Sequence, residues 1–184
     1  MTVIAWDGTT LAADKQRTVN GRKLTGTKIH RIRKCLVGVT GDTDQSASLL
    51  AWFEDGEDPA TYPVSFNAND WPQLIVIRPG ADVGIYTRTP HIVVIEDRFV
   101  AFGSGAEYAL ATMGLGFDAV RAVEIASRFD VHCGMGIDTL TFDGTQPLLD
   151  PDNAPDSRPC IVCGNPTMHI GNTCYACSHA KAGG

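Results

Sequence analysis

The sequence predicts an α+β fold in which two β-sheets are sandwiched between helix layers, a four-layer αββα arrangement. Two blocks of short apolar, β-branched segments, separated by turn residues, predict the strands. Longer stretches with apolar residues at helical spacing follow each block and predict the helices. Strands, then helix, then strands, then helices and a final strand is an order typical of a layered α+β domain.

The first β block begins at the N-terminus. Asp7-Gly8 is a strong hairpin signal, so the chain is expected to open with two antiparallel strands. A polar stretch over residues 15–27 separates this hairpin from a second strand pair, which ends at Thr40-Gly41-Asp42. The strands expected in this block cover residues 2–6, 11–13, 28–32 and 36–39.

Helices and further strands follow. Thr43 or Asp44 is expected to cap the first helix, and residues 56–69, rich in Pro, Asp, Asn and Gly, predict a loop. Gly103-Ser104-Gly105 leads into the second helix. The expected helices cover residues 45–53, 106–115 and 118–128, the last with Phe129 beside its apolar face. The expected later strands cover residues 74–78, 83–87, 91–95, 99–102 and 137–142.

Composition narrows the class of protein. The 184 residues are 43% hydrophobic, which supports a real core, and the formal net charge is −6. An acidic chain of this kind does not fit a partner role with nucleic acid or an anionic membrane, because both call for a basic face. The N-terminus has no basic segment followed by an apolar one, and the apolar runs are strand-sized, so we expect a soluble cytoplasmic protein.

The cysteines define a separate C-terminal segment. Cys160, Cys163, Cys174 and Cys177 form two C-x-x-C pairs within the last 25 residues. Two such pairs complete a tetrahedral four-thiolate shell, which suits a structural Zn²⁺. An iron–sulfur site or a redox pair is the alternative. Three divisions follow: a domain over residues 1–147, a Pro- and Asp-containing linker over residues 148–159, and a zinc ribbon-like segment over residues 160–184.

The second residue is a candidate nucleophile. A hydroxyl needs an adjacent base, and an N-terminal residue carries its own, because an α-amino group has a pKa of about 7.7–8.0. Removal of Met1, which precedes a small residue, would expose Thr2 with its amine free. By itself this signal is weak, since many proteins begin with Met-Thr.

The order of several short motifs resembles proteasome β subunits and the bacterial HslV protease. In both families a threonine opens a strand, an aspartate ends the next one and a lysine follows on a third. The segments that carry the resemblance are residues 2–8, 11–16, 26–32, 37–42, 103–105 and 130–138, and together they span roughly residues 2–143. The resemblance implies an N-terminal-nucleophile (Ntn) hydrolase fold.

Site residues follow from the resemblance. It implies that Thr2 attacks through its hydroxyl, with Lys28 beside that hydroxyl and Asp14 holding the lysine. The backbone N–H of Gly41 would donate to the oxyanion. Ser104 and Asp130 would form a hydrogen-bonded shell around the threonine amine, and the backbone around Thr18 would align a substrate strand. Taken singly, each of these residues could also have a purely structural role, such as ending a strand or forming a turn. Cys133 stands where the family commonly has serine, and it is expected to pack rather than react.

The expected function is therefore a threonine-type peptidase acting on a peptide or protein substrate. The alternatives are an Ntn amide hydrolase for a non-peptide substrate, and a catalytically silent scaffold that uses its zinc ribbon for interaction. The resemblance also implies a homo-oligomer and a possible ATPase partner. Both families have a long second helix soon after the first, whereas here only residues 54–69 fill that place, so ring size stays open.

Overall fold

The computed structural model describes residues 2–63 and 71–142. Within these residues the chain builds two main sheets and a separate hairpin. The first sheet has the strand order β10-β1-β2-β11, and the second has the order β5-β6-β7-β8-β9. The expected linker and cysteine segment lie outside the described residues, as does Met1.

The strands of the first sheet come from both ends of the domain. They are β1 (Ile4–Trp6), β2 (Thr10–Asp14), β10 (Val100–Phe102) and β11 (Ile137–Thr141). The predicted hairpin joins β1 to β2, with Ile4 opposite Ala13, and Ile137 of β11 lies opposite Asp14. All pairings are antiparallel. The start of β1 and the end of β2 therefore lie next to each other, at the same end of the sheet's two central strands.

The strands of the second sheet are neighbours in the order in which they follow one another in sequence. Its strands are β5 (Ile29–Ile32), β6 (Cys35–Thr40), β7 (Gln73–Ile77), β8 (Val83–Tyr86) and β9 (Val93–Ile95). Neighbouring strands pair antiparallel throughout. The helix α1 (Thr43–Asp55) follows β6 and packs against β6 and β7.

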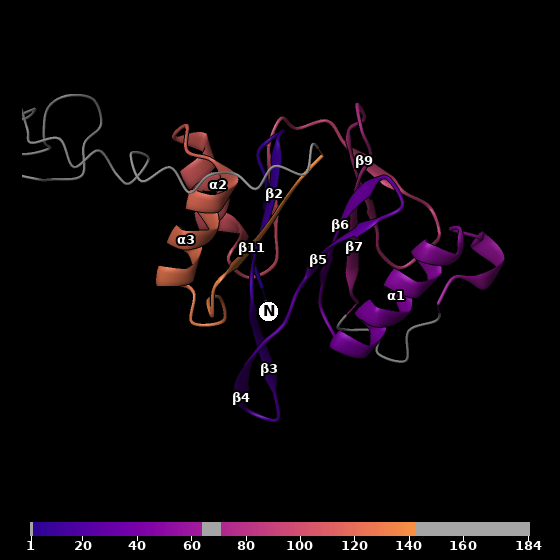
Figure 1. Ribbon diagram of the computed structural model, residues 1–184, viewed down its shortest axis with the longest axis horizontal. Helices are drawn as coiled ribbons and strands as arrows, with labels where there is room; N and C mark the ends of the chain where they lie inside the picture. Colours follow the sequence, from indigo (N-terminus) through magenta and orange to yellow (C-terminus); the bar gives the residue numbers. More distant parts are fainter. Residues whose placement is uncertain (1, 64–70, 143–184) are drawn as a thin grey trace, which may run out of the picture. The chain divides into compact units, whose positions relative to one another are not determined.

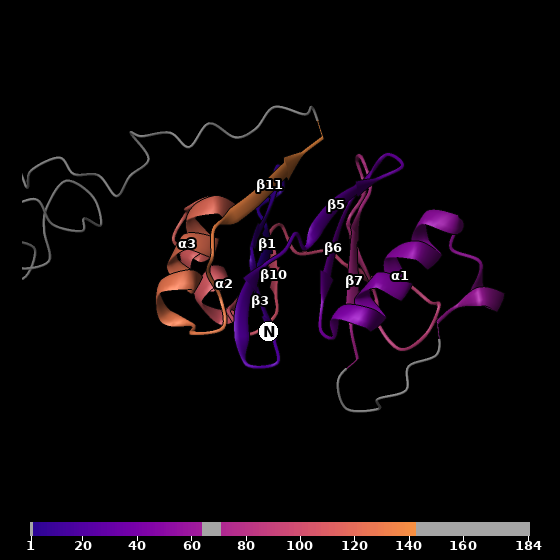
Figure 2. The same ribbon diagram turned by 60° about the horizontal axis from the view of Figure 1, so that its bottom comes forward.

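Alternating side chains build a core in three layers. On β1, Val3 and Ala5 pack toward α2 (Ala106–Gly114) and α3 (Ala119–Phe129), whereas Ile4 and Trp6 pack between the two sheets. A third cluster fills the space between the second sheet and α1, around Phe53. The first sheet is thus buried on both faces. Figures 1 and 2 show the resulting order of helices, sheet, sheet and helix, which is the predicted αββα sandwich.

The sequence does not indicate three features of the elements. The predicted strand over residues 99–102 is present as Val100–Phe102, and it joins the first sheet, away from the strands that precede it in sequence. The polar stretch after β2 contains a hairpin, β3 (Gln16–Val19) and β4 (Arg22–Thr25), which extends beyond the end of β2 in Figure 1. The expected loop after α1 includes a short 3₁₀ helix at Pro59–Thr61.

The caps and faces of two helices also differ from expectation. Asp42, not Thr43 or Asp44, caps α1, because its carboxylate accepts from the N–H groups of Asp44 and Gln45. Phe129 is 65% exposed and stacks on Tyr108 instead of entering the core. Among the helices of residues 2–63 and 71–142, none is long and apolar enough to cross a bilayer.

Candidate active site

Thr2 is held where β1 begins, by the turn that leads into α2. Its carbonyl oxygen accepts from the Gly105 N–H at 3.2 Å and from Ser104 Oγ at 3.4 Å. Gly103 has φ +92°, and a Cβ there would lie 2.2 Å from the Thr2 carbonyl oxygen. Only glycine fits this position, both for its backbone conformation and for the close approach. Thr2 itself is 3% exposed.

Asp14 is the centre of the site. It ends β2, is fully buried, and accepts five hydrogen bonds. Its Oδ1 accepts from Thr2 Oγ1 at 2.8 Å, Lys28 Nζ at 2.7 Å and the Val3 N–H at 2.9 Å. Its Oδ2 accepts from the N–H groups of Gln16 and Gly134, each at 3.0 Å. A carboxylate with this many donors is held in one orientation.

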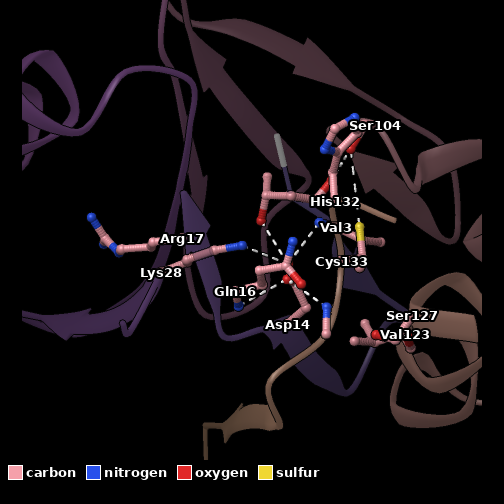
Figure 3. A network of polar contacts seen from close by, with 12 residues as sticks. Val3, Asp14, Gln16, Arg17, Lys28, Ser104, Val123, Ser127, His132 and Cys133 are labelled. Atoms are coloured by element: carbon pink, nitrogen blue, oxygen red, sulfur yellow. Dashed lines mark hydrogen bonds and ion pairs between the residues drawn. The ribbon is translucent and has the colours of Figure 1, made fainter. Parts of the chain in front are cut away.

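Lys28 reaches the same carboxylate oxygen as the threonine hydroxyl. It lies just before β5, and its backbone carbonyl accepts from the Val39 N–H at 3.0 Å, so its backbone is fixed beside β6. Figure 3 shows Lys28 directed at Asp14. Because Lys28 Nζ and Thr2 Oγ1 both donate to Asp14 Oδ1, the ammonium and the hydroxyl lie side by side.

Burial controls the charge on this lysine. Removal from water lowers the pKa of Lys28, and the hydrogen bond and charge of Asp14 oppose that effect without cancelling it. The result is a lysine that gives up its proton more readily than a surface lysine. Such a group can share a proton with a neighbouring hydroxyl and stabilise negative charge on its oxygen.

A second polar cluster adjoins Thr2 from the loop after α3. Asp130 accepts from the His132 N–H at 2.9 Å and from Cys133 Sγ at 3.3 Å. Burial tends to raise the pKa of Asp130, but hydrogen bonds from Ser104, His132 and Cys133 outweigh it, so the pKa is lowered. Ser104 therefore links Asp130 to the Thr2 carbonyl, and the connection to Thr2 runs through the backbone.

Cys133 packs in this cluster as a neutral thiol. It is 4% exposed, and burial together with the charges of Asp14 and Asp130 raises its pKa to about 12. A thiol with that pKa is not a nucleophile at neutral pH. This geometry agrees with the packing role expected from the sequence.

Gly41 lies on the wall of a pocket that opens beside Thr2. The pocket has a volume of about 280 Å³ and is lined by Thr2, Lys28, Gly41, residues of β3 and the N-terminal end of α1. Gly41 has φ +95°, and a Cβ there would lie 2.7 Å from the Cα of Pro72. The backbone of this turn therefore faces the pocket without a side chain in the way.

The six predicted site residues thus gather in one region. One oxygen of Asp14 accepts from both Thr2 and Lys28. Ser104 bonds to the Thr2 carbonyl and to Asp130, and Gly41 lines the pocket.

Sequence reasoning missed Gln16 and Arg17 as pocket residues, and it missed the two backbone donors to Asp14 Oδ2. Strand alternation from Asp14 could have indicated Gln16, since both side chains are buried.

The predicted zinc ligands Cys160, Cys163, Cys174 and Cys177 lie outside the described residues. Within residues 2–63 and 71–142, no group of three or more His, Cys, Asp or Glu side chains is placed to hold a metal ion.

Comparison with known proteins points in the same direction as this geometry. No protein-family profile matches the chain. Proteasome subunit beta 1 of Thermococcus gammatolerans is 47% identical over 60 residues, a match that covers 27% of this chain and 30% of that subunit. The match therefore spans less than a third of the archaeal subunit.

Solved structures match over most of the chain. Eukaryotic HslV from Trypanosoma brucei superposes with a TM-score of 0.57 at 23% identity, covering 76% of this chain and 97% of HslV. BPH of Thiobacillus denitrificans gives 0.57 at 17% identity, covering 79% and 99%. A Gly-1 mutant of Anbu from Hyphomicrobium sp. strain MC1 gives 0.56 at 13% identity, covering 79% and 86%.

These structures define the class of fold. The chain has the Ntn-hydrolase fold of proteasome β subunits and HslV. The predicted resemblance is confirmed at the level of the fold.

Proposed function

We propose that this chain is a threonine-type peptidase of the proteasome and HslV kind, with Thr2 as nucleophile after removal of Met1. The observation that carries the proposal is the shared acceptor. A threonine hydroxyl and a buried lysine both donate to Asp14 Oδ1, at the wall of a pocket large enough for a substrate side chain. A threonine hydroxyl needs an activating base, and an adjacent cation stabilises the negative charge that develops on its oxygen.

The reaction would run through an acyl-enzyme. The Thr2 oxygen attacks the substrate carbonyl while its proton passes to the Thr2 amine, and Lys28 stabilises the developing negative charge. The Gly41 N–H donates to the oxyanion of the tetrahedral intermediate. Collapse expels the amine product, which takes up the proton, and leaves an ester on Thr2. Water then attacks the ester and releases the acid, with the same groups acting in reverse.

One solved protein with this fold provides a chemical probe. BPH of Thiobacillus denitrificans has been crystallised in complex with epoxomicin. The same compound is therefore a suitable probe for Thr2 here.

Mass-resolved labelling tests the proposal. We expect the native chain to lack Met1, to gain one epoxomicin adduct on Thr2, and to cleave fluorogenic peptides. Thr2→Ala, or a tag left in place ahead of Thr2, should abolish both labelling and cleavage, whereas Thr2→Ser should retain them in part. Peptide cleavage by Thr2→Ala, or a native chain that keeps Met1, would overturn the mechanism. Turnover of small acylated amines without peptide cleavage would favour a non-peptide amide hydrolase, and no turnover of either kind a silent scaffold.

The C-terminal cysteines are proposed to bind one structural Zn²⁺. Four thiolates fill a tetrahedral shell and leave no position for a reacting water. Metal analysis of the purified chain should give one zinc per chain, and none after Cys160 and Cys163 are replaced by serine. Iron instead of zinc would contradict the proposal.

Assembly and location are likewise proposals. We expect a cytoplasmic homo-oligomer, since the solved proteins with this fold include HslV. Native mass spectrometry would give the number of subunits, and a monomer at working concentration would contradict this expectation. Addition of a host ATPase fraction to the peptidase assay would test for an ATPase partner.

A further inference from the structure

Arg17 has an unusual position on the wall of the Thr2 pocket. It lies on β3, next to the buried Gln16, and both residues line the pocket. Its Nη2 donates to the Thr27 carbonyl at 2.7 Å, while its Nε is buried and has no hydrogen-bond partner among the described residues. The guanidinium is thus fixed at one end and has a buried donor left over.

Gly26 makes room for this side chain. A Cβ on Gly26 would lie 2.3 Å from Arg17 Nε and 2.5 Å from Arg17 Cδ. The arginine therefore lies flat across the glycine, on the strand partner side of the hairpin. A residue with any side chain at Gly26 would displace the guanidinium from its present position.

Lys28, the other basic residue of the pocket, already has an ionic partner. It is bound to Asp14 at 2.7 Å. The Asp42 carboxylate, which also lines the pocket, accepts from two backbone N–H groups at the start of α1, at 3.0 and 3.1 Å. Arg17 differs from Lys28, because its hydrogen-bond acceptor is a neutral carbonyl and not a carboxylate.

The surroundings leave the guanidinium as the group that would attract a negative charge. Burial and the charge of Arg17 lower the pKa of His30, so this neighbour adds no positive charge of its own. The N-terminal end of the 13-residue helix α1 also lines the pocket through Thr43 and Ser46, but two of its first N–H groups are already bound by the Asp42 carboxylate.

We propose that Arg17 makes the pocket selective for an acidic side chain, so that the enzyme cleaves after aspartate or glutamate. The substrate carboxylate would bind the guanidinium through N–H groups that the Thr27 carbonyl does not occupy, and the planar shape of the guanidinium favours a carboxylate partner. This inference rests on the proposed peptidase function and names its substrate class.

The experiment uses the full-length protein and four fluorogenic peptides that differ only in the residue before the scissile bond. That residue is Glu, Gln, Leu or Lys, and the quantity compared is the ratio of kcat/KM values. The Glu peptide should exceed its neutral isostere, the Gln peptide, by about tenfold or more, as expected for a charge-assisted hydrogen bond. Because this is a ratio, it does not depend on the fraction of active enzyme.

Three variants separate charge from position. Arg17→Gln should bring the Glu-to-Gln ratio close to one, and Arg17→Glu should make the Lys peptide the better substrate. Gly26→Ala keeps the arginine but displaces it, so the ratio should fall there too. Arg22→Gln removes an exposed arginine from β4 of the same hairpin, outside the pocket, and should keep the wild-type ratio. Thermal unfolding of each variant checks that it is folded.

The outcomes distinguish the inference from the function on which it rests. Cleavage of all four peptides with a Glu-to-Gln ratio near one in the wild type would overturn the role of Arg17 and leave the peptidase intact. A high ratio that persists in Arg17→Gln would also overturn it. No cleavage and no epoxomicin adduct would remove the proposed function, and the inference with it.

Discussion

Lys28 Nζ lies 2.7 Å from Asp14 Oδ1 in an ion pair whose side chains are only 5% and 0% exposed. Removing one partner of a buried pair leaves an uncompensated charge, at a cost of about 3–5 kcal/mol. Asp14→Ala should therefore lower the free energy of unfolding by about that amount, measured by urea denaturation. The double variant Asp14→Ala/Lys28→Met should recover part of the loss, because no charge is then stranded.

The neighbouring pair of Lys15 and Asp138 is the control. Its atoms are also 2.7 Å apart, but the side chains are 31% and 24% exposed. Partly solvated pairs contribute at most about 1 kcal/mol, so Lys15→Ala should cost far less than Asp14→Ala. Equal losses in the two variants would show that burial does not govern the Asp14 pair.

Much of this region could be predicted from local sequence. The Asp7-Gly8 turn fixes the hairpin of β1 and β2. That hairpin brings Thr2 and Asp14 together at the same end of the two strands. The position of Lys28 could not be predicted from local sequence. Its approach to Asp14 depends on how the second sheet packs on the first, and only the order of motifs shared with a known family indicated it.

Three other features could not be predicted, because the local sequence is compatible with more than one structure: a strand partner, a helix cap and a polar hairpin. Val100–Phe102 pairs with β1, across the domain from the strands that precede it, and no local signal selects that partner. Asp42, Thr43 and Asp44 are all good cap residues, so backbone geometry decides among them. Apart from the buried Gln16, the side chains of the hairpin of β3 and β4 are mostly polar and exposed, so its strands lack the apolar alternation that identifies a strand.

Gly41→Ala should distort the pocket. The residue has φ +95°, which costs about 1–3 kcal/mol for a non-glycine residue, and its new Cβ would lie 2.7 Å from Pro72 Cα. We expect lower stability and a lower kcat/KM for peptides. Gly80→Ala is the control, since it has φ +70° with no atom within 4 Å of the added Cβ. It should lose stability through backbone strain alone and retain its kcat/KM; equal kinetic losses would contradict a local effect at Gly41.

Asp130→Asn should change how stability depends on acid. The folded-state pKa of Asp130 lies below its ordinary value of 3.8, so its stabilising effect is complete above pH 3.8 and is lost as pH falls through the folded pKa. The variant should be less stable than the wild type at pH 7, by about 1–3 kcal/mol for a buried acceptor with altered hydrogen bonds. The difference should shrink as the pH falls below 3.8, as followed by urea unfolding across pH. A difference that grows on acidification would have the wrong sign for a lowered pKa.

Cys133 should resist alkylation in the folded protein. With a pKa of about 12, only about one thiol in ten thousand is ionised at pH 8, compared with roughly a quarter of the molecules of an ordinary cysteine. The thiolate is the reactive form, and the side chain is also 4% exposed, so both access and ionisation slow the reaction. Iodoacetamide treatment followed by peptide mass mapping should leave Cys133 unmodified in the native state and modify it in urea.

A conservative replacement separates packing from chemistry at the same position. Cys133→Ser keeps a donor for Asp130, with a shorter and stronger O–H bond in place of the thiol at 3.3 Å, whereas Cys133→Ala leaves that carboxylate one donor short. Cleavage of peptides should therefore survive Cys133→Ser and fall in Cys133→Ala, together with stability. Rapid alkylation of native Cys133, or loss of cleavage in the serine variant with unchanged stability, would instead identify a thiol that takes part in the reaction.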